Sequence, residues 1–320
     1  MGKFIDPRAD WAFKRIFGSD DTKECLITFL NGLFKGELTI TDVMFEKNEQ
    51  TKQREDERGV IFDVKCKTQD GRHIIVEMQK KEQEFFVDRA LYYSAKAIVG
   101  QGLKGRWNYH LAPVYTICLM DFVAEEGIPA QFRTDYALCN IETGKQELER
   151  MRIVYLQLPL FQGKTEADCE DDIFKCWIYI LRNMSNLESM PFIDKYPVFR
   201  KLAAISDIRQ LSPEEQEMYD EDLKIMRDLY ATKLFEIKRR KREREKALTE
   251  GRAEGLEKGR AEGRAEGRAE GLEKGKNTEK QETAKRLLAI GLTPEQVAEG
   301  TLLSLEDVMK IYQQTQHLSN

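Results

Sequence analysis

The 320-residue chain has only three histidines, His73, His110 and His317, and none of its six cysteines forms a CxxC pair. A zinc site needs Cys and His at ligand spacing, so this shortage excludes a zinc finger or a zinc enzyme. Most of the cysteines stand in apolar surroundings, which is typical of reduced core thiols in a cytosolic protein. Any metal used by this chain is therefore expected to be a hard ion held by carboxylates.

Long apolar runs are also lacking. No stretch of 18 apolar residues occurs, so we expect no membrane span. The first residues, MGKFIDPRADW, have no apolar segment after their charges, so no secretory signal is expected and the predicted location is cytoplasmic. The formal net charge of −5 excludes a uniformly basic nucleic-acid binder but leaves a locally basic one open.

The hydrophobic patterns predict a mixed α/β domain over residues 1–160. Apolar residues at helical spacing indicate a helix over 9–34, broken near 18–21, and another over 82–101. Runs rich in β-branched and aromatic residues predict strands at 38–46, 60–68, 72–79, 113–121 and 152–158. The expected order is helix, three strands, helix, strand.

The second half of the chain is expected to be helical and charged. Residues 161–235 predict a helical region, and 236–278 a basic and repetitive linker or long helix. The basic run at 238–246, KRRKREREK, is either a contact for nucleic-acid phosphates or a solvated helix face.

Glycine recurs at every fourth position from Gly251 to Gly275. Because each glycine costs a helix about 1 kcal/mol relative to alanine, this tract is either a flexible tether or a helix whose glycine stripe pairs with a second copy to make a homo-oligomer. The last segment, 279–320, predicts two short helices with N-caps at Thr293 and Ser304.

Two acids lie on the two central predicted strands. Alternation places Phe62 and Val64 on one face of the first strand and Asp63 on the other. In the second strand it places Val76 on the apolar face and Glu77 on the opposite one. Burial requires the two apolar faces to lie on the same side of the sheet, so the register between the strands is constrained.

The loop between these strands decides the register. A two-residue turn would put an acid on the apolar face. A three-residue loop, 69–71, places Gly71 in the left-handed position of a G1 bulge, which suits glycine. That register sets Asp63 directly opposite Glu77, with Cβ atoms about 4.5–5.5 Å apart.

Two carboxylates so placed repel each other unless a cation or a proton lies between them. Mg²⁺ binds one or two carboxylates together with waters and phosphate oxygens, and it can activate water against a phosphodiester. The hairpin taken alone leaves a second alternative open. In it, the acids belong to a solvated sheet face and Lys65 and Lys67 are their counter-charges.

An acid in one strand, a hairpin, then acid-x-amide in the next strand, flanked by helices, resembles the PD-(D/E)XK nuclease superfamily. The chain resembles its transposase-like branch, the recombination-promoting nucleases, more closely. The residues that carry the resemblance are Asp10-Trp11-Ala12-Phe13-Lys14, Phe17-Gly18, Asp63, Glu77-Met78-Gln79 and Arg89-Ala90-Leu91-Tyr92-Tyr93. The repeat tract and the terminal helices are also similar, so the resemblance covers most of the chain.

The resemblance implies a restriction-endonuclease-like α/β core and a metal-dependent DNA endonuclease that acts in recombination or mobile DNA. The implied ion is Mg²⁺, with Mn²⁺ as an alternative. Asp63 and Glu77 would be its ligands. Gln79 stands where the superfamily has lysine, and it can orient water or phosphate by hydrogen bonds but supplies no charge. The alternative is a weak or inactive DNA-binding or assembly protein on the same fold.

Two further residues have double interpretations. The resemblance makes Asp10 an accessory acid from the first helix, whereas its spacing to Lys14 also fits a surface ion pair. Arg89 would either hold a DNA phosphate or pair with one of the acids beneath it.

Overall fold

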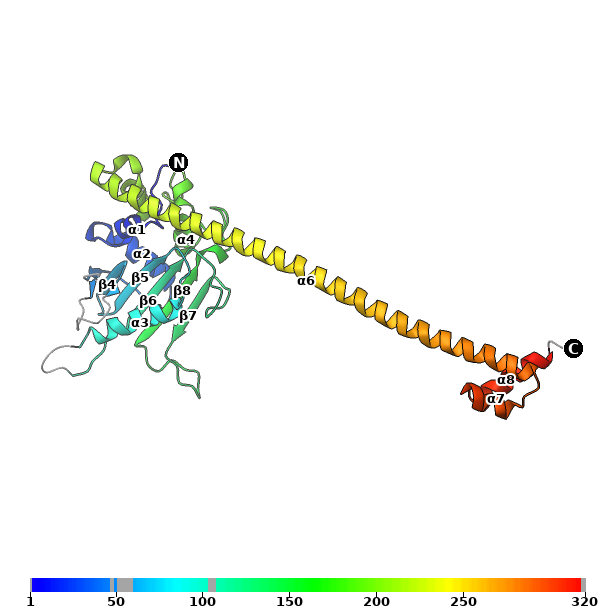
Figure 1. Cartoon of the computed structure of the whole chain (residues 1–320). Helices are drawn as coiled ribbons and strands as arrows, with labels where there is room; N and C mark the ends of the chain where they lie inside the picture. Colours follow the sequence, from blue (N-terminus) through cyan, green and yellow to red (C-terminus); the bar gives the residue numbers. More distant parts are fainter. Residues whose placement is uncertain (1, 47–48, 51–59, 103–107, 318–320) are drawn as a thin grey trace. The chain divides into compact units, whose positions relative to one another are not determined.

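The protein is described here by a computed structural model, which covers residues 2–46, 49–50, 60–102 and 108–317. Its chain divides into two compact units, Met1–Lys233 and Leu234–Asn320. The first unit is a mixed α/β domain with helices on both faces of a six-stranded sheet (Figure 1).

The six strands lie in the order β1-β4-β5-β6-β8-β7. They are β1 (Val43–Phe45), β4 (Val64–Thr68), β5 (His73–Gln79), β6 (Val114–Met120), β8 (Met151–Gln157) and β7 (Arg133–Ala137). The pairs β5–β6 and β6–β8 are parallel, and the other pairs are antiparallel. Two short strands, β2 (Glu49–Gln50) and β3 (Val60–Ile61), pair separately.

One helix, α3 (Phe86–Val99), covers one face of the sheet (Figure 1). The other face is covered by α1 (Asp10–Phe17), α2 (Lys23–Leu33), α4 (Ile173–Asn183) and α5 (Val198–Ser206). Short 3₁₀ turns connect these elements: η1 (Asp20–Thr22), η2 (Leu158–Leu160), η3 (Met184–Asn186) and η4 (Ile208–Gln210). The helices that follow residue 160 therefore share one hydrophobic core with the first two helices.

The main core is built from aromatic side chains of the helices and alternate residues of the strands. Phe29 and Trp177 are fully buried, and Val64 and Val76 face them from β4 and β5. The predicted break between the first two helices is confirmed at Gly18, where a Cβ would lie 2.7 Å from the carbonyl oxygen of Lys14. Only glycine fits such an approach without a shift of the backbone.

The strand predicted over 60–68 is wrong in one respect, because it is interrupted before β4 begins at Val64. Phe62 packs with Ile75 against α3, whereas alternation placed it on the face of Val64. The prediction failed because residues 62 and 63 lie outside the ladder, so the two-residue alternation does not carry across them.

Other elements differ in length or were missed. The strand expected over 38–46 is reduced to the three residues of β1, and the helix expected from residue 82 begins at Phe86. Strand β7 was not predicted, because its sequence, RTDYA, is mostly polar and lies at the sheet edge.

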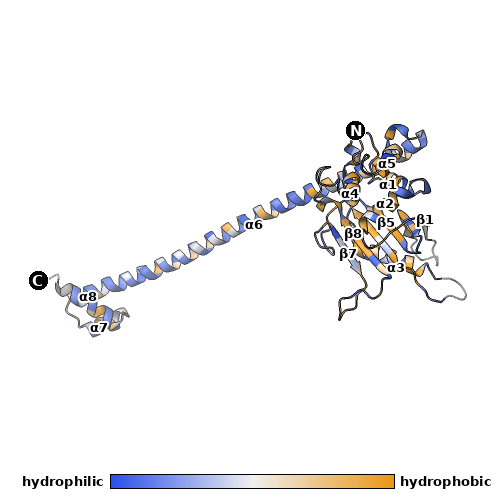
Figure 2. Ribbon diagram, turned by 180° about the vertical axis from the view of Figure 1, so that it is seen from behind, coloured by the Kyte–Doolittle hydropathy of each residue, from blue (hydrophilic) through white to orange (hydrophobic). Residues whose placement is uncertain are grey.

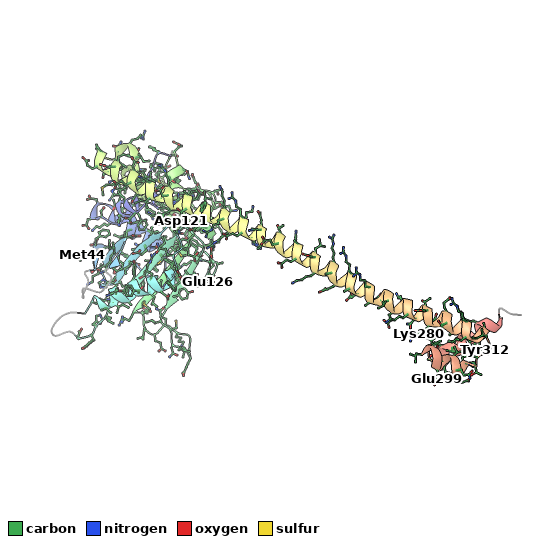
Figure 3. All side chains as sticks on the ribbon, viewed as in Figure 1. Met44, Asp121, Glu126, Lys280, Glu299 and Tyr312 are labelled. Atoms are coloured by element: carbon green, nitrogen blue, oxygen red, sulfur yellow. The ribbon has the colours of Figure 1, made fainter. Side chains whose placement is uncertain are left out.

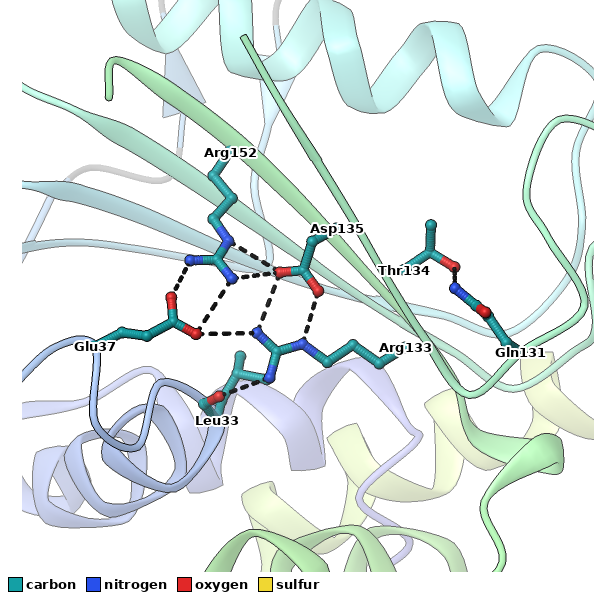
Figure 4. Close-up of polar contacts among 7 residues, drawn as sticks. All are labelled: Leu33, Glu37, Gln131, Arg133, Thr134, Asp135 and Arg152. Atoms are coloured by element: carbon teal, nitrogen blue, oxygen red, sulfur yellow. Dashed lines mark hydrogen bonds and ion pairs between the residues drawn. The ribbon is translucent and has the colours of Figure 1, made fainter. Parts of the chain in front are cut away.

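Ion pairs hold β7 in place (Figure 4). Arg133 and Arg152 both bind the carboxylate of Asp135, at 2.7 and 2.8 Å, and both also pair with Glu37 after α2. Arg133 donates a further hydrogen bond of 3.0 Å to the carbonyl of Leu33. The edge strand is thus fixed by charge to the helix layer.

The second unit contains the rest of α6 (Pro213–Ala289), with α7 (Pro294–Thr301) and α8 (Leu305–His317). The N-caps predicted at Thr293 and Ser304 are confirmed: Thr293 forms a capping box with Gln296, and Ser304 accepts a hydrogen bond from the Asp307 N–H at 3.1 Å.

The three helices enclose a small core of their own. Its buried residues include Val297 and Val308, and Tyr312, labelled in Figure 3, packs against them. The long helix leading to it is largely hydrophilic (Figure 2). Within the described chain, no helix combines the length and the apolar character that crossing a bilayer needs.

Candidate active site

The hairpin of β4 and β5 has the register predicted from its loop. The Thr68 N–H donates to the Arg72 carbonyl at 2.9 Å, and Gly71 has a φ of +90°. Val64 pairs with Val76, as expected for a three-residue loop. The same register places Asp63, the residue before β4, beside Glu77.

Two hydrogen bonds from backbone N–H groups tie the acid pair together, one to each carboxylate. The Asp63 N–H donates to Oε1 of Glu77 at 3.2 Å. The Met78 N–H donates to Oδ2 of Asp63 at 2.8 Å. Asp63 is half-buried and Glu77 is only 5% exposed. The structure therefore brings together the two carboxylates that the sequence analysis singled out, at the edge of the α3-covered face.

Burial dominates the electrostatics of this pair. It raises the pKa of Glu77, and the nearby charge of Asp63 raises it further. The pKa of Asp63 is likewise raised, first by burial and then by the charge of Asp10, whereas the Met78 N–H and the charge of Lys14 lower it. The site thus resists holding two negative charges unless positive charge is added.

Gln79 lies between Glu77 and Arg89. Its Nε2 donates to Oε2 of Glu77 at 3.2 Å, and its Oε1 accepts a hydrogen bond from Arg89. The Arg89 guanidinium also donates to Gln83 and lies against the rings of Phe86 and Tyr93. Within the described residues, these hydrogen bonds of Arg89 go to the amides of Gln79 and Gln83, and its charge also lowers the pKa of Glu77.

Asp10 is on α1, beside the pair. It forms an ion pair with Lys14 at 2.8 Å, and its side chain is 44% exposed. The charges of both residues act on Asp63 in opposite senses. The surface ion pair and the nearness to the site are therefore both present.

The two lysines considered as counter-charges, Lys65 and Lys67, differ in burial and in partner. Lys65 is buried and binds Glu46 at 3.3 Å, and His73 lies 3.0 Å from the same carboxylate. The hydrogen bond with His73 is the main cause that lowers the pKa of Glu46 to about 2. Lys67 is exposed. Lys65 thus neutralises Glu46, a partner that strand alternation gave no means of finding.

A second acid near the site was also missed. Asp121, labelled in Figure 3, follows β6, and its N–H donates to the Gln79 carbonyl at 2.8 Å. Its carboxylate pairs with Arg8 at 3.3 Å, and Arg8 pairs with Asp6 at 2.7 Å. The sequence did contain a signal for Asp121, because it is an acid directly after a buried strand, and functional residues gather at the ends of such strands.

The donor set can be tested against a metal. Over the described part of the chain, no group of three or more His, Cys, Asp or Glu side chains is arranged to hold one. Asp63 and Glu77 offer carboxylate oxygens only, which suits a hard divalent cation completed by waters and phosphate oxygens. Their resistance to double ionisation is what such a cation would relieve.

A mixed α/β fold with paired acids on adjoining strand segments is consistent with the PD-(D/E)XK nuclease-like class of proteins. Residues 7–234 match the model of the PD-(D/E)XK nuclease family transposase. This match spans more than half of the chain, and the protein belongs to that family. No curated protein and no solved structure gives a significant match.

Proposed function

We propose that the protein is a Mg²⁺-dependent DNA endonuclease that hydrolyses phosphodiester bonds in recombination or mobile DNA. Family membership supports a nuclease with DNA as its substrate. The observation that carries the proposal is the contact between the half-buried Asp63 and the buried Glu77, whose pKa values are both raised.

Each residue has a separate part in this proposal. Asp63 and Glu77 would hold the cation, with Mn²⁺ as an alternative to Mg²⁺. The bound ion would activate water and offset charge on the phosphodiester. Gln79 is fixed by Glu77 and Arg89, so its amide is held in one orientation for water or phosphate. Asp10 would act as an accessory charge.

The absence of lysine at position 79 is offset in part by Arg89. Its guanidinium contacts the Gln79 amide and lowers the pKa of Glu77. Positive charge therefore reaches the site through an arginine of α3. An arginine so placed can also stabilise charge that develops on the phosphate.

The glutamine at position 79, where the superfamily has lysine, favours a second candidate function. This is a DNA-binding or assembly protein that cleaves slowly or not at all. A glutamine cannot carry the charge of a lysine. Retained DNA binding without cleavage, in wild type and in Asp63→Ala alike, would identify this second function.

The test is cleavage of supercoiled plasmid by the full chain with Mg²⁺ or with EDTA. We expect nicking that needs the metal and falls at least about 100-fold in Asp63→Ala and in Glu77→Ala, since each removes a ligand of the ion that activates water. The control is Asp88→Ala, an exposed acid of α3. Nicking that persists in both variants would locate the activity elsewhere.

A further inference from the structure

Helix α1, which carries Asp10 and Lys14, has no cap of its own. The residue before it is Ala9, whose side chain cannot accept a hydrogen bond. The first N–H groups of a helix need acceptors from elsewhere. The Trp11 N–H finds one in the carboxylate of Asp222, which lies in α6, 211 residues further along the chain. A negative charge at this end also favours the helix dipole.

Two more residues of α6 hold the same segment. The Asp6 N–H donates to the hydroxyl of Tyr219 at 2.7 Å, and the Tyr219 ring lies 5.9 Å from that of Trp11. Glu215 forms an ion pair with Arg15 of α1. Positions 215, 219 and 222 share one helix face, and Tyr219 is only 3% exposed.

The opposite side of the segment is fixed to the strand ends. Arg8 bridges Asp6 and Asp121, and the Asp121 N–H is bonded to the Gln79 carbonyl. Residues 6–11 therefore lie between the end of β5, where the site is, and the first turns of α6.

We propose that Asp222 is a positioning residue of the candidate site. By capping α1 from α6, it holds Asp10 and Lys14 beside the Asp63–Glu77 pair. The first turns of α6 are thus a structural part of the site. This inference rests on the proposed function in one respect, since it takes the acid pair to bind a divalent cation.

The test compares the full-length wild type with Asp222→Ala, Asp222→Asn and the control Asp228→Ala, an exposed aspartate of α6. Amide hydrogen exchange reports the cap, the rise in Tm with Mg²⁺ or Mn²⁺ alone reports cation binding, and plasmid cleavage gives kcat and KM.

In Asp222→Ala we expect faster exchange at residues 11–13, a smaller metal-induced rise in Tm, and kcat lower by about 10-fold with KM for DNA unchanged. That factor corresponds to about 1.4 kcal/mol. Asp222→Asn keeps an acceptor oxygen and should recover most of the loss, and Asp228→Ala should match the wild type.

The possible failures are distinguishable. Faster exchange in Asp222→Ala with a wild-type metal response and kcat would mean that Asp222 only stabilises α1, and the positioning role would be wrong. A wild type that neither cleaves DNA nor responds to either metal would contradict the proposed function, and this inference would fall with it.

Discussion

At the scale of single residues, Glu77 shows how burial and charge oppose each other. Burial first, and the charge of Asp63 second, raise its pKa. In the unfolded chain a glutamate has a pKa of about 4.3. Above that value the unfolded state gives up the proton first, so the folded state loses stability as the pH rises toward the folded pKa. Below it, both states hold the proton and the penalty disappears.

Replacement of Glu77 by glutamine removes this penalty. In EDTA we expect the free energy of unfolding of Glu77→Gln, relative to wild type, to rise by at least about 1 kcal/mol between pH 5 and pH 8, since one pKa unit corresponds to about 1.4 kcal/mol. Urea unfolding at the two pH values measures it. An unchanged difference would show that Glu77 is not held in its protonated form by the fold.

At the scale of elements, much of the hairpin could be predicted. Val64 and Val76 need a common face, and Gly71 suits a left-handed turn position, so local sequence was enough to set Asp63 beside Glu77. The face of Phe62 could not be predicted, because alternation assumes an unbroken ladder.

Contacts between distant segments lie beyond local pattern altogether. Lys65 pairs with Glu46, and the Trp11 N–H donates to Asp222. The spacing of these residues in the sequence follows neither helix nor strand periodicity, so it could not predict the contacts. Strand β7 depends in the same way on ion pairs with Glu37, so its polar sequence gave no strand signal of the usual kind.

The repeat tract of α6 gives a prediction at this scale. A Cβ at Gly259, Gly263 or Gly267 would have no atom within 4 Å beyond the backbone of its own helix turns. Replacing all three by alanine should therefore stabilise the helix by roughly 3 kcal/mol, at about 1 kcal/mol each, and raise its melting temperature in circular dichroism. Weaker self-association on sedimentation would instead mean that the glycines pack against a second copy.

At the scale of the whole molecule, the site and the tail are joined through one helix. The contacts of α6 with the N-terminal segment come from Glu215, Tyr219 and Asp222. They all lie within the first compact unit, which ends at Lys233.

A chain that ends at Lys246 keeps each of these contacts and loses the repeat tract. We expect this fragment to retain the wild-type metal-induced rise in Tm and at least about half of the plasmid cleavage, because no residue of the site is removed. Thermal melts and nicking assays beside the full chain measure both. A loss of the metal response would show that the tail contributes to the site.

The family match ends at residue 234 and the compact unit at Lys233, yet α6 continues without a break to Ala289. The border of the matched region thus falls inside a helix. Beyond the last packed turn of such a helix, the following residues need only have sufficient helix propensity. Many different sequences meet that requirement. We therefore expect relatives to share the first unit and to carry tails of quite different length and composition.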